Sequence, residues 1–372
     1  MTMISNIGLK RLLSRAFFGI WDLFDYRGHR ANSLVSHITS PGAVTDRNSE
    51  IKVGILKEAW GLHHHYISAC DVLGFNYEVI DMFASDAVDN VLRSDCSFMV
   101  ARPSVQYSVW KHMFDNRLAL LAGNLSAQIF PDALSLWLWE SKLRTHEFLS
   151  INKIPHAQGS IIYRISDVDK VGKSLGYPLV YKADRASGSS GVKIFSSNVD
   201  LKRFARRKMQ SGRRTYRDKH VDKEHGVLLL QQFHPNLKEW RIIRIGDYYF
   251  GFEKLKEHQF HSGSKNFSYG MPPLEVLNLT LNVFTKFDFR YCSVDVFVTE
   301  SGELLVNEIQ PYFGQENDRE LLVIDGVSGR LKHDARENKW VFEKGEFCKH
   351  NLCVLRLSEM AKEYEASTLT AR

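Results

Sequence analysis

The sequence has 372 residues and a net charge of +6; 44% of the residues are hydrophobic and 25% are charged. One hydrophobic core rarely supports this length, so we expect two or three structural units, and the composition excludes a disordered chain. The longest apolar stretch, around residues 118–139, is interrupted by polar residues and a proline. No run reaches the roughly 18 residues that a membrane span needs, so we expect no transmembrane segment.

Five cysteines are scattered along the chain without a CxxC pair or the spacing of zinc ligands. An odd number in a chain of this size is typical of reduced thiols in the cytoplasm. The start of the chain is basic and apolar but has no small-residue cleavage site, so we expect no signal peptide. These features favour a cytoplasmic protein.

Residues 1–49 predict an N-terminal extension that contains an amphipathic helix. Apolar residues such as Leu9, Leu12 and Phe17 recur at helical spacing, with Lys10 and Arg15 off that face. One interpretation is a helix on the anionic inner face of the membrane, which would make the protein peripheral to it. The other, which we favour, is a helix packed on the body of the protein or on a second subunit of an oligomer.

Residues 50–135 predict a small parallel α/β domain. We expect strands at 51–56, 77–80 and 96–100, and a helix over 64–73 that ends at Gly74. Strands alternating with helices are typical of crossover connections. The adjacent residues His63, His64 and His65 do not converge on one ion, so we assign them to a loop–helix junction.

Residues 136–320 predict an α+β unit with antiparallel hairpins. A helical pattern over 133–150 is broken at Ile154-Pro155, and a second helix is expected at 167–175. Residues 321–372 predict a hairpin and a closing helix. The expected strands of the α+β unit are 178–183, 192–195, 227–232, 241–245, 248–252, 293–298 and 304–309.

A strand that carries Lys182 is followed by a loop rich in glycine and serine, Ser187-Gly188-Ser189-Ser190-Gly191. The backbone N–H groups of such a loop can approach phosphate oxygens, and the lysine supplies a charge for the same group. The spacing differs from the P-loop signature. A plain hairpin turn explains the loop equally well.

Three oxygen-bearing side chains on two later strands indicate a magnesium site. Glu308 and Gln310 are two residues apart, so they share one face of a strand, and Asp295 comes from the preceding strand across a Ser-Gly turn. Oxygen ligands suit magnesium. The alternative is a polar hairpin face, which the surrounding valines and isoleucines make less favourable, because buried carboxylates need partners.

The segment between these two elements has the features of a nucleotide hinge. A strand runs into Gln231-Gln232-Phe233-His234, whose backbone can pair with an adenine edge. Glu239 can accept hydrogen bonds from ribose hydroxyls, and Arg241 and Arg244 offer planar forks for phosphate or carboxylate. An exposed amphipathic strand is the plain alternative.

Taken in order, these elements resemble the ATP-grasp family, closest to its peptide–glutamate ligase, glutathione synthetase and D-alanine–D-alanine ligase branches. The resemblance covers about Lys142 to Gly314. It implies two α+β lobes that clasp ATP, at about 153–233 and 234–320, behind the small parallel α/β domain. By resemblance the catalytic residues are Arg241, Lys182 and Asn266, and the metal ligands are Asp295, Glu308 and Gln310. ATP would be bound by Lys142, Lys182, Ser187, Gly188, Ser189, Ser190, Gly191, Gln231, Gln232, Phe233, His234 and Glu239.

Two residues depart from the family pattern. The third metal ligand is normally asparagine and here is Gln310, and the Pro-Gly that usually follows is replaced by Phe313-Gly314. A glutamine still offers a carbonyl oxygen, so we expect the metal site to persist with altered geometry. We expect these two departures to affect the part of the site that binds the acceptor substrate more than the part that binds ATP.

The resemblance implies an ADP-forming ligase that uses ATP and magnesium, with two ions expected, to join a carboxylate to an amine through an acyl phosphate. The substrates would be small anionic molecules, and the carboxylate substrate would be acidic or related to surface polysaccharides. The rivals are an ATP-grasp phosphotransferase and a non-catalytic nucleotide-binding module.

The positive charge is concentrated in residues 201–225, where ten basic residues face three acidic ones and leave the rest of the chain nearly neutral. No RNA-binding motif or finger spacing accompanies this segment, so we do not expect nucleic acid as a partner. A mobile flap that steers an anionic substrate and a solvated surface helix are equally compatible with its composition.

Overall fold

The computed structural model describes residues 49–57, 63–103, 105, 107–185, 191–214, 223–256, 266–312 and 319–370. The amphipathic helix expected in the N-terminal extension lies outside these ranges. So do the loop residues 187–190 and the segment 215–222. No helix of the described residues is long and apolar enough to cross a membrane.

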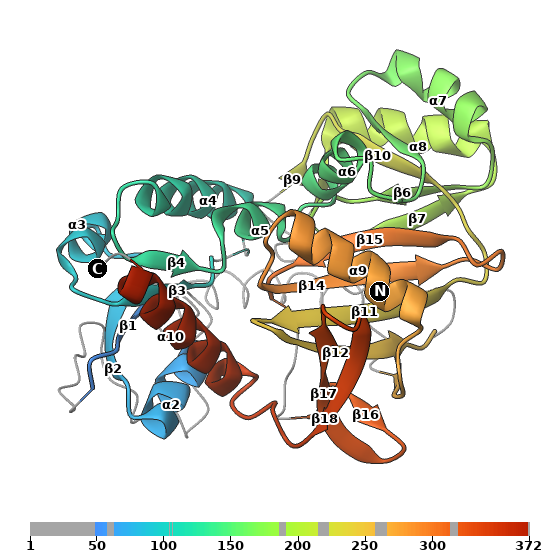
Figure 1. Ribbon diagram of the computed structural model, residues 1–372. Coiled ribbons are helices and arrows are strands. Elements are labelled where there is room, and N and C mark those ends of the chain that lie inside the picture. Colours follow the sequence, from blue (N-terminus) through green and yellow to red (C-terminus); the bar gives the residue numbers. More distant parts are fainter. Residues whose placement is uncertain are drawn as a thin grey trace, which may run out of the picture.

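The first described unit is a four-stranded parallel sheet in the order β2-β1-β3-β4 (Figure 1). The strands expected from sequence are present, because their continuous apolar runs suit a sheet buried on both faces. The helix expected before Gly74 ends there in the left-handed conformation, φ 70°. The elements are β1 Lys52–Lys57, α2 His64–Leu73, β2 Asn76–Asp81, α3 Ala87–Arg93, β3 Phe98–Ala101, α4 Ser108–Ala122 and β4 Gln128–Phe130.

Two short helices replace the single helical run expected over 133–150. Helix α5 (Ala133–Leu138) is capped by Asp132, and α6 (Lys142–Ile151) is capped by Ser141. Glu140, between them, has a positive φ of 55°, which a continuous helix cannot contain.

The small lobe is an antiparallel sheet in the order β5-β10-β6-β7, covered by two helices. Its core includes Leu179, Tyr181, Leu201 and Leu230. Its strands are β5 Gly159–Ile162, β6 Leu179–Lys182, β7 Val192–Phe195 and β10 Leu228–Gln232, and its helices are α7 Val168–Leu175, after a short 3-10 turn at Ile165–Asp167, and α8 Asn198–Ser211.

The basic segment is therefore not a flap over its whole length. Residues 201–211 belong to α8, which is anchored by the buried Leu201 and Ala205. Lys208 is also buried, and its Nζ lies 2.9 Å from Glu224 Oε2. After α8, β8 (Arg213–Arg214) pairs with β9 (Lys223–Glu224).

The large lobe is an eight-stranded sheet with the path β15-β14-β11-β12-β17-β16. The expected C-terminal hairpin is part of this sheet, because β17 pairs with β12. Helix α9 (Leu274–Lys286) packs through Val276 and Phe284. The strands are β11 Lys238–Ile245, β12 Tyr248–Lys254, β13 Phe267–Ser268, β14 Tyr291–Val298, β15 Leu304–Gln310, β16 Val323–Ile324, β17 Val327–Asp334 and β18 Lys339–Lys344.

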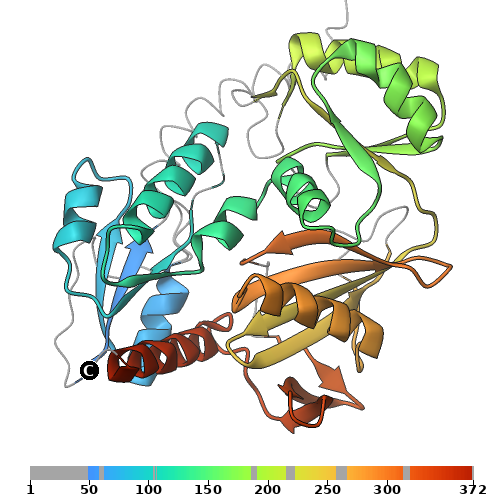
Figure 2. The ribbon, with the colours of Figure 1, turned by 45° about the horizontal axis from the view of Figure 1, so that its top comes forward.

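The C-terminal helix α10 (Cys353–Thr370) returns to the start of the chain and packs against α2 (Figure 1). Its other side reaches the large lobe, where Glu363 Oε1 accepts hydrogen bonds from Arg290 Nε at 2.5 Å and the Tyr291 hydroxyl at 2.7 Å. Figure 2 shows the parallel sheet and α10 on one side, with the small lobe above the large-lobe sheet on the other.

Candidate nucleotide and metal site

The centre of the site is a row of side chains across three neighbouring strands. Arg241 on β11 is directly opposite Asp295 on β14, and Asp295 is directly opposite Glu308 on β15. Directly opposed residues share a face and have Cβ atoms about 4.5–5.5 Å apart. The antiparallel register thus places one cation and two carboxylates side by side.

Asp295 is held by two cations. Arg241 donates from Nε to Oδ1 and from Nη2 to Oδ2, both at 2.7 Å, and Lys254 Nζ lies 2.5 Å from Oδ2. Only 1% of Asp295 is exposed. Burial alone would raise the pKa of Asp295, but the charges of Arg241 and Lys254 outweigh it and hold that pKa well below its ordinary value.

Lys254 was not expected from the sequence, yet it joins two predicted site residues. Its Nζ also lies 2.7 Å from Oε1 of Glu239, which is 1% exposed. The expected ribose acid is therefore paired with a lysine on the neighbouring strand. The pairing depends on cross-strand register, because Lys254 and Glu239 are directly opposite each other on β12 and β11.

Glu308 differs from Asp295 in its surroundings. Burial is the largest influence on the pKa of Glu308 and raises it, and the nearby charge of Asp295 adds to the rise, while Lys142 lowers it. Among the described residues, the Glu308 side chain makes no hydrogen bond or ion pair. A half-buried carboxylate in this state favours the approach of a cation.

Gln310 lies on the same face as Glu308. With its amide oriented to suit its neighbours, Gln310 accepts a hydrogen bond from Arg241 Nη2 at 2.6 Å and donates to the Tyr312 carbonyl oxygen at 3.2 Å. Its own backbone carbonyl accepts from Ser293 Oγ at 3.1 Å. The glutamine that departs from the family pattern thus contacts Arg241.

The donor set fits magnesium in chemical type, because it consists of oxygens. Glu308 fits as the anchoring ligand, while both oxygens of Asp295 already contact cations. Within the described ranges, no group of three or more histidine, cysteine or acidic side chains is placed to hold a metal.

Lys182 enters the site from the small lobe. Burial, the largest influence, and the charge of Lys142 lower the pKa of Lys182 to about 8, while Glu308 and Glu239 act in the opposite direction. Its Nζ donates to Asn307 Oδ1 at 2.7 Å. Side chains of the two lobes therefore meet here.

Asn307 was missed by the sequence analysis, because it depends on a β-bulge. Asp295 pairs with Glu308, but the next pair is Val296 with Val306, so Asn307 is the extra residue. A bulge re-aims one side chain of a strand. Here that residue contacts the lysine of the other lobe.

Lys142 is positioned by Asp184, a second residue that the sequence analysis missed. Asp184 lies two residues after Lys182, and its Oδ1 accepts from Leu143 N at 2.9 Å and from Ser141 Oγ at 2.7 Å. The backbone N–H of Lys142 donates to the Asp184 carbonyl oxygen at 3.2 Å. The start of α6 is thus fixed to the end of β6, which brings the two lysines together.

Known proteins are similar to parts of this chain. No family model matches the chain. The arginine-specific large chain of carbamoyl phosphate synthase from Halalkalibacterium halodurans is 24% identical over 185 residues, which cover 46% of this chain and only 16% of that protein.

Solved structures cover more of the chain. The biotin carboxylase domain of 2-oxoglutarate carboxylase from Hydrogenobacter thermophilus, in complex with MgADP, ADP and bicarbonate, matches with a TM-score of 0.53 and 17% identity, over 71% of this chain and 64% of that one. An ADP complex of N5-carboxyaminoimidazole ribonucleotide synthetase matches with a TM-score of 0.53 and 14% identity, over 74% and 73%. A parallel sheet followed by two antiparallel α+β sheets agrees with these neighbours.

The chain has the ATP-grasp fold. Identities this low establish a shared fold and not a shared substrate. The chain also spans less than two thirds of the carbamoyl phosphate synthase chain and of the biotin carboxylase domain.

The residues of the expected hinge include two buried polar atoms without a hydrogen-bond partner among the described residues, Gln231 Oε1 and His234 Nε2. The backbone N–H of Gln232 donates to Gln158 O at 2.8 Å, and that of Phe233 donates to Pro178 O at 3.3 Å. Unsatisfied buried polar atoms are rare and fit a site built for a polar ligand such as adenine.

The remaining predicted residues are less central. Asn266 is exposed, and its backbone carbonyl accepts from Leu255 N at 3.0 Å. Gly191 accepts from Ala183 N at 2.9 Å, which brings the two ends of the phosphate-loop candidate together.

Arg244 is three residues from Arg241 and so lies on the other face of β11, where Nε donates to Gly246 O at 2.9 Å. Its expected role as a second phosphate fork was wrong.

Proposed function

We propose that this protein is an ATP-dependent carboxylate–amine ligase that releases ADP and resembles the peptide–glutamate ligase and glutathione synthetase branch. The observation that carries the proposal is the meeting of Lys182 from the small lobe with Asn307 and Glu308 from the large lobe. Lysines facing a carboxylate row across two lobes suit a triphosphate and its cation.

The proposal gives each of these residues a role. Lys142 and Lys182 contact phosphate oxygens, Gln231 and His234 supply polar atoms at the adenine edge, and Glu239 faces the ribose. Glu308 anchors the cation, with Asp295 and Gln310 beside it. Magnesium, when bound, would be held by Glu308 and would neutralise part of the phosphate charge of ATP.

The chemistry needs no nucleophile from the protein. A carboxylate oxygen of the substrate attacks the γ-phosphorus, the bond to the β-phosphate oxygen breaks, and ADP leaves. The amine then attacks the acyl carbon, loses a proton and displaces phosphate. Lys182 and Arg241 offset the negative charge that develops during transfer, which is where fixed cations contribute most.

The test is to incubate the protein with MgATP, hydroxylamine and a panel of amino acids and dicarboxylates. Hydroxylamine converts an acyl phosphate into a hydroxamate, so ADP and hydroxamate should form in equal amounts with the true carboxylate. ADP without any hydroxamate would favour the phosphotransferase. MgATP binding without ADP would favour the non-catalytic module. Glu308→Gln serves as the inactive control.

A further inference from the structure

A pocket lies apart from the row of Arg241, Asp295 and Glu308. It is at the carboxyl ends of two strands of the N-terminal parallel sheet. It is a partly enclosed hollow that opens to solvent. Open α/β sheets commonly bind ligands at this edge. Its lining comes from three parts of the chain: Ile55, Leu56, His63, Tyr66, Val100 and Arg102 from the N-terminal unit, Tyr312 from the end of β15, and Asn351, Cys353 and Arg356 from the region of α10.

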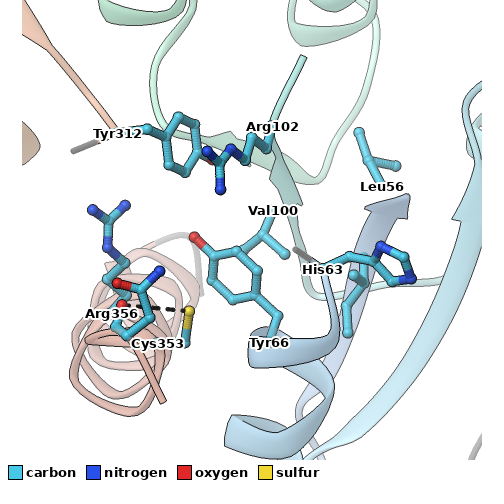
Figure 3. A pocket seen from close by; sticks show the side chains of 10 residues that line it. Leu56, His63, Tyr66, Val100, Arg102, Tyr312, Cys353 and Arg356 are labelled. Carbon is cyan, nitrogen blue, oxygen red and sulfur yellow. Dashed lines mark hydrogen bonds between the residues drawn. The ribbon is translucent and has the colours of Figure 1, made fainter. Parts of the chain in front are cut away.

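The polar groups of the pocket are positively charged or hydrogen-bond donors. Figure 3 shows the Arg102 and Arg356 side chains on either side of the Tyr66 hydroxyl, near the Tyr312 ring. The Cζ atoms of Arg102 and Arg356 lie 5.2 Å and 5.4 Å from the centroid of that ring. None of the described residues that line the pocket is acidic.

The arginine on α10 is fixed rather than solvated. Arg356 is 4% exposed, and its Nη2 donates to the Pro311 carbonyl oxygen at 3.1 Å. Burial would lower the pKa of Arg356, but the phenol groups of Tyr66 and Tyr312 raise it, so the guanidinium stays charged. A rigid, always charged fork is suited to bidentate contact with carboxylate or phosphate.

The pocket and the ATP row share one segment of chain. Tyr312 is two residues after Gln310 and accepts the hydrogen bond from its amide. Two residues of extended chain span about 7 Å. Tyr312, which lines the pocket, therefore lies about 7 Å or less along the chain from Gln310, whose amide contacts Arg241.

We propose that this pocket binds the anionic group, a carboxylate or a phosphate, of the substrate that reacts with ATP, and that Arg102 and Arg356 determine this specificity. The proposal rests on the proposed function for the reacting end of the substrate. The substrate would be a small molecule with an anionic tail in the pocket and its reacting group beside Glu308.

The experiment is calorimetric titration of the full chain with two probes, malonate and inorganic phosphate, in the presence of MgADP. Either probe should bind the wild type, and the tighter one identifies the group. Arg102→Met and Arg356→Met should each weaken binding about ten- to a hundredfold, the effect of losing one charge-assisted hydrogen bond. Arg203→Met, which removes a charge from the exposed face of α8, should leave the affinity unchanged.

Two further variants separate charge from folding. Because Arg356 is buried, its replacement can disturb folding, so Arg356→Met is compared with Arg356→Lys, which keeps a charge. Arg102 is only half-buried, so the thermal unfolding of Arg102→Met should match that of the wild type. Arg356→Lys should recover the affinity for phosphate better than the affinity for malonate, because lysine lacks the forked geometry of arginine. Absence of binding by both probes, or equal affinities in the wild type, Arg102→Met and Arg356→Met, would overturn the proposal.

Failure of the pocket and failure of the ATP site give different results. MgATP titration of Lys182→Ala reports the ATP site alone, and anion titration without nucleotide reports the pocket alone. If the protein binds MgATP but neither anion, the pocket proposal is wrong and the proposed function stands. If the protein binds the anions through both arginines but does not bind MgATP, the proposed function is wrong.

Discussion

At the residue scale, the site depends on how buried charges are compensated. Asp295 has two cations against it, whereas Glu308 has none in hydrogen-bonding contact among the described residues. Two carboxylates directly opposite each other in one register therefore differ in what they can do. Asp295 fixes Arg241 and Lys254, and Glu308 is the group that a cation would engage.

We expect Lys182→Ala to weaken MgATP binding about ten- to a hundredfold, the range for one charge-assisted contact. The fold should persist, because Lys182 is at the end of β6 and only half-buried. Calorimetric titration measures the effect. Lys193→Ala, which removes an exposed lysine opposite Tyr181 in the same sheet, should bind MgATP like the wild type. Equal affinity in the two variants would remove Lys182 from the site.

The lowered pKa of Lys182, about 8, predicts a pH dependence. The side chain is charged below that pH and becomes neutral as the pH rises through it, so MgATP affinity should be full near pH 7 and fall above about pH 8. Bound phosphate stabilises the charged form and moves the fall to higher pH. Lys182→Arg stays charged throughout and should bind with a flat profile. A wild-type profile as flat as that of the arginine variant contradicts the assignment.

Glu308→Gln should reduce ADP formation by about a hundredfold or more, because it removes a full charge from a cation site. Gln310→Asn restores the usual family residue and keeps a carbonyl oxygen, so its effect should be small. Steady-state ADP release measures both. If the two variants are equally inactive, the contact of Gln310 with Arg241 is what matters, and not ligation.

At the element scale, the bulge in β15 provides a hydrogen bond between the two lobes. It adds Asn307 between Val306 and Glu308 and brings the amide to Lys182. Asn307→Ala should weaken MgATP binding about three- to tenfold, less than Lys182→Ala, because a neutral hydrogen-bond partner contributes about 0.5–1.5 kcal/mol. The pKa of Lys182, followed through the pH dependence of MgATP affinity, should shift in the same variant. An unchanged pH profile would show that Asn307 does not position the lysine.

The basic segment divides at the end of α8. The helical part is anchored on the small lobe, so we expect any steering of anions to come from residues 213–219. Arg213→Ala/Arg214→Ala/Arg217→Ala should lower the association rate of MgATP at low salt and have no effect near 1 M salt, where the Debye length is about 3 Å. Stopped-flow binding measures the rate. The control is the triple alanine variant of Lys202, Arg203 and Arg206 on α8, and matching salt dependences in the two variants would exclude steering by residues 213–219.

At the scale of the whole molecule, α10 connects the N-terminal sheet to the large lobe. Leu357 and Met360 are fully buried in a core that includes residues of both units. Leu357→Ala should therefore lower the free energy of unfolding by about 2–5 kcal/mol. Leu369→Ala, at an exposed position near the end of the same helix, should change it by no more than about 0.5 kcal/mol. Denaturant unfolding measures both, and a similar small effect of the two substitutions would show that α10 does not join the units.

The sequence by itself determined the order of the elements and predicted most residues of the candidate nucleotide site. Apolar runs and turn residues are local properties, so the strands around Lys182, Asp295 and Glu308 could be predicted from them. The resemblance of those motifs to the ATP-grasp family predicted the fold. The break at Glu140 was missed, because a positive φ at a non-glycine residue has no sequence signal as clear as Gly74.

Only the tertiary structure decided which charges are compensated and which parts of the chain meet. Asn307 depends on a bulge, Lys254 on cross-strand register, and Asp184 on a contact between α6 and the end of β6. The pocket joins Arg102 to Arg356, which are far apart in the sequence, through the packing of α10 on α2. Periodicity in a sequence reports which face of an element is buried, but not which distant element covers it, because burial on that face is favourable against any apolar surface.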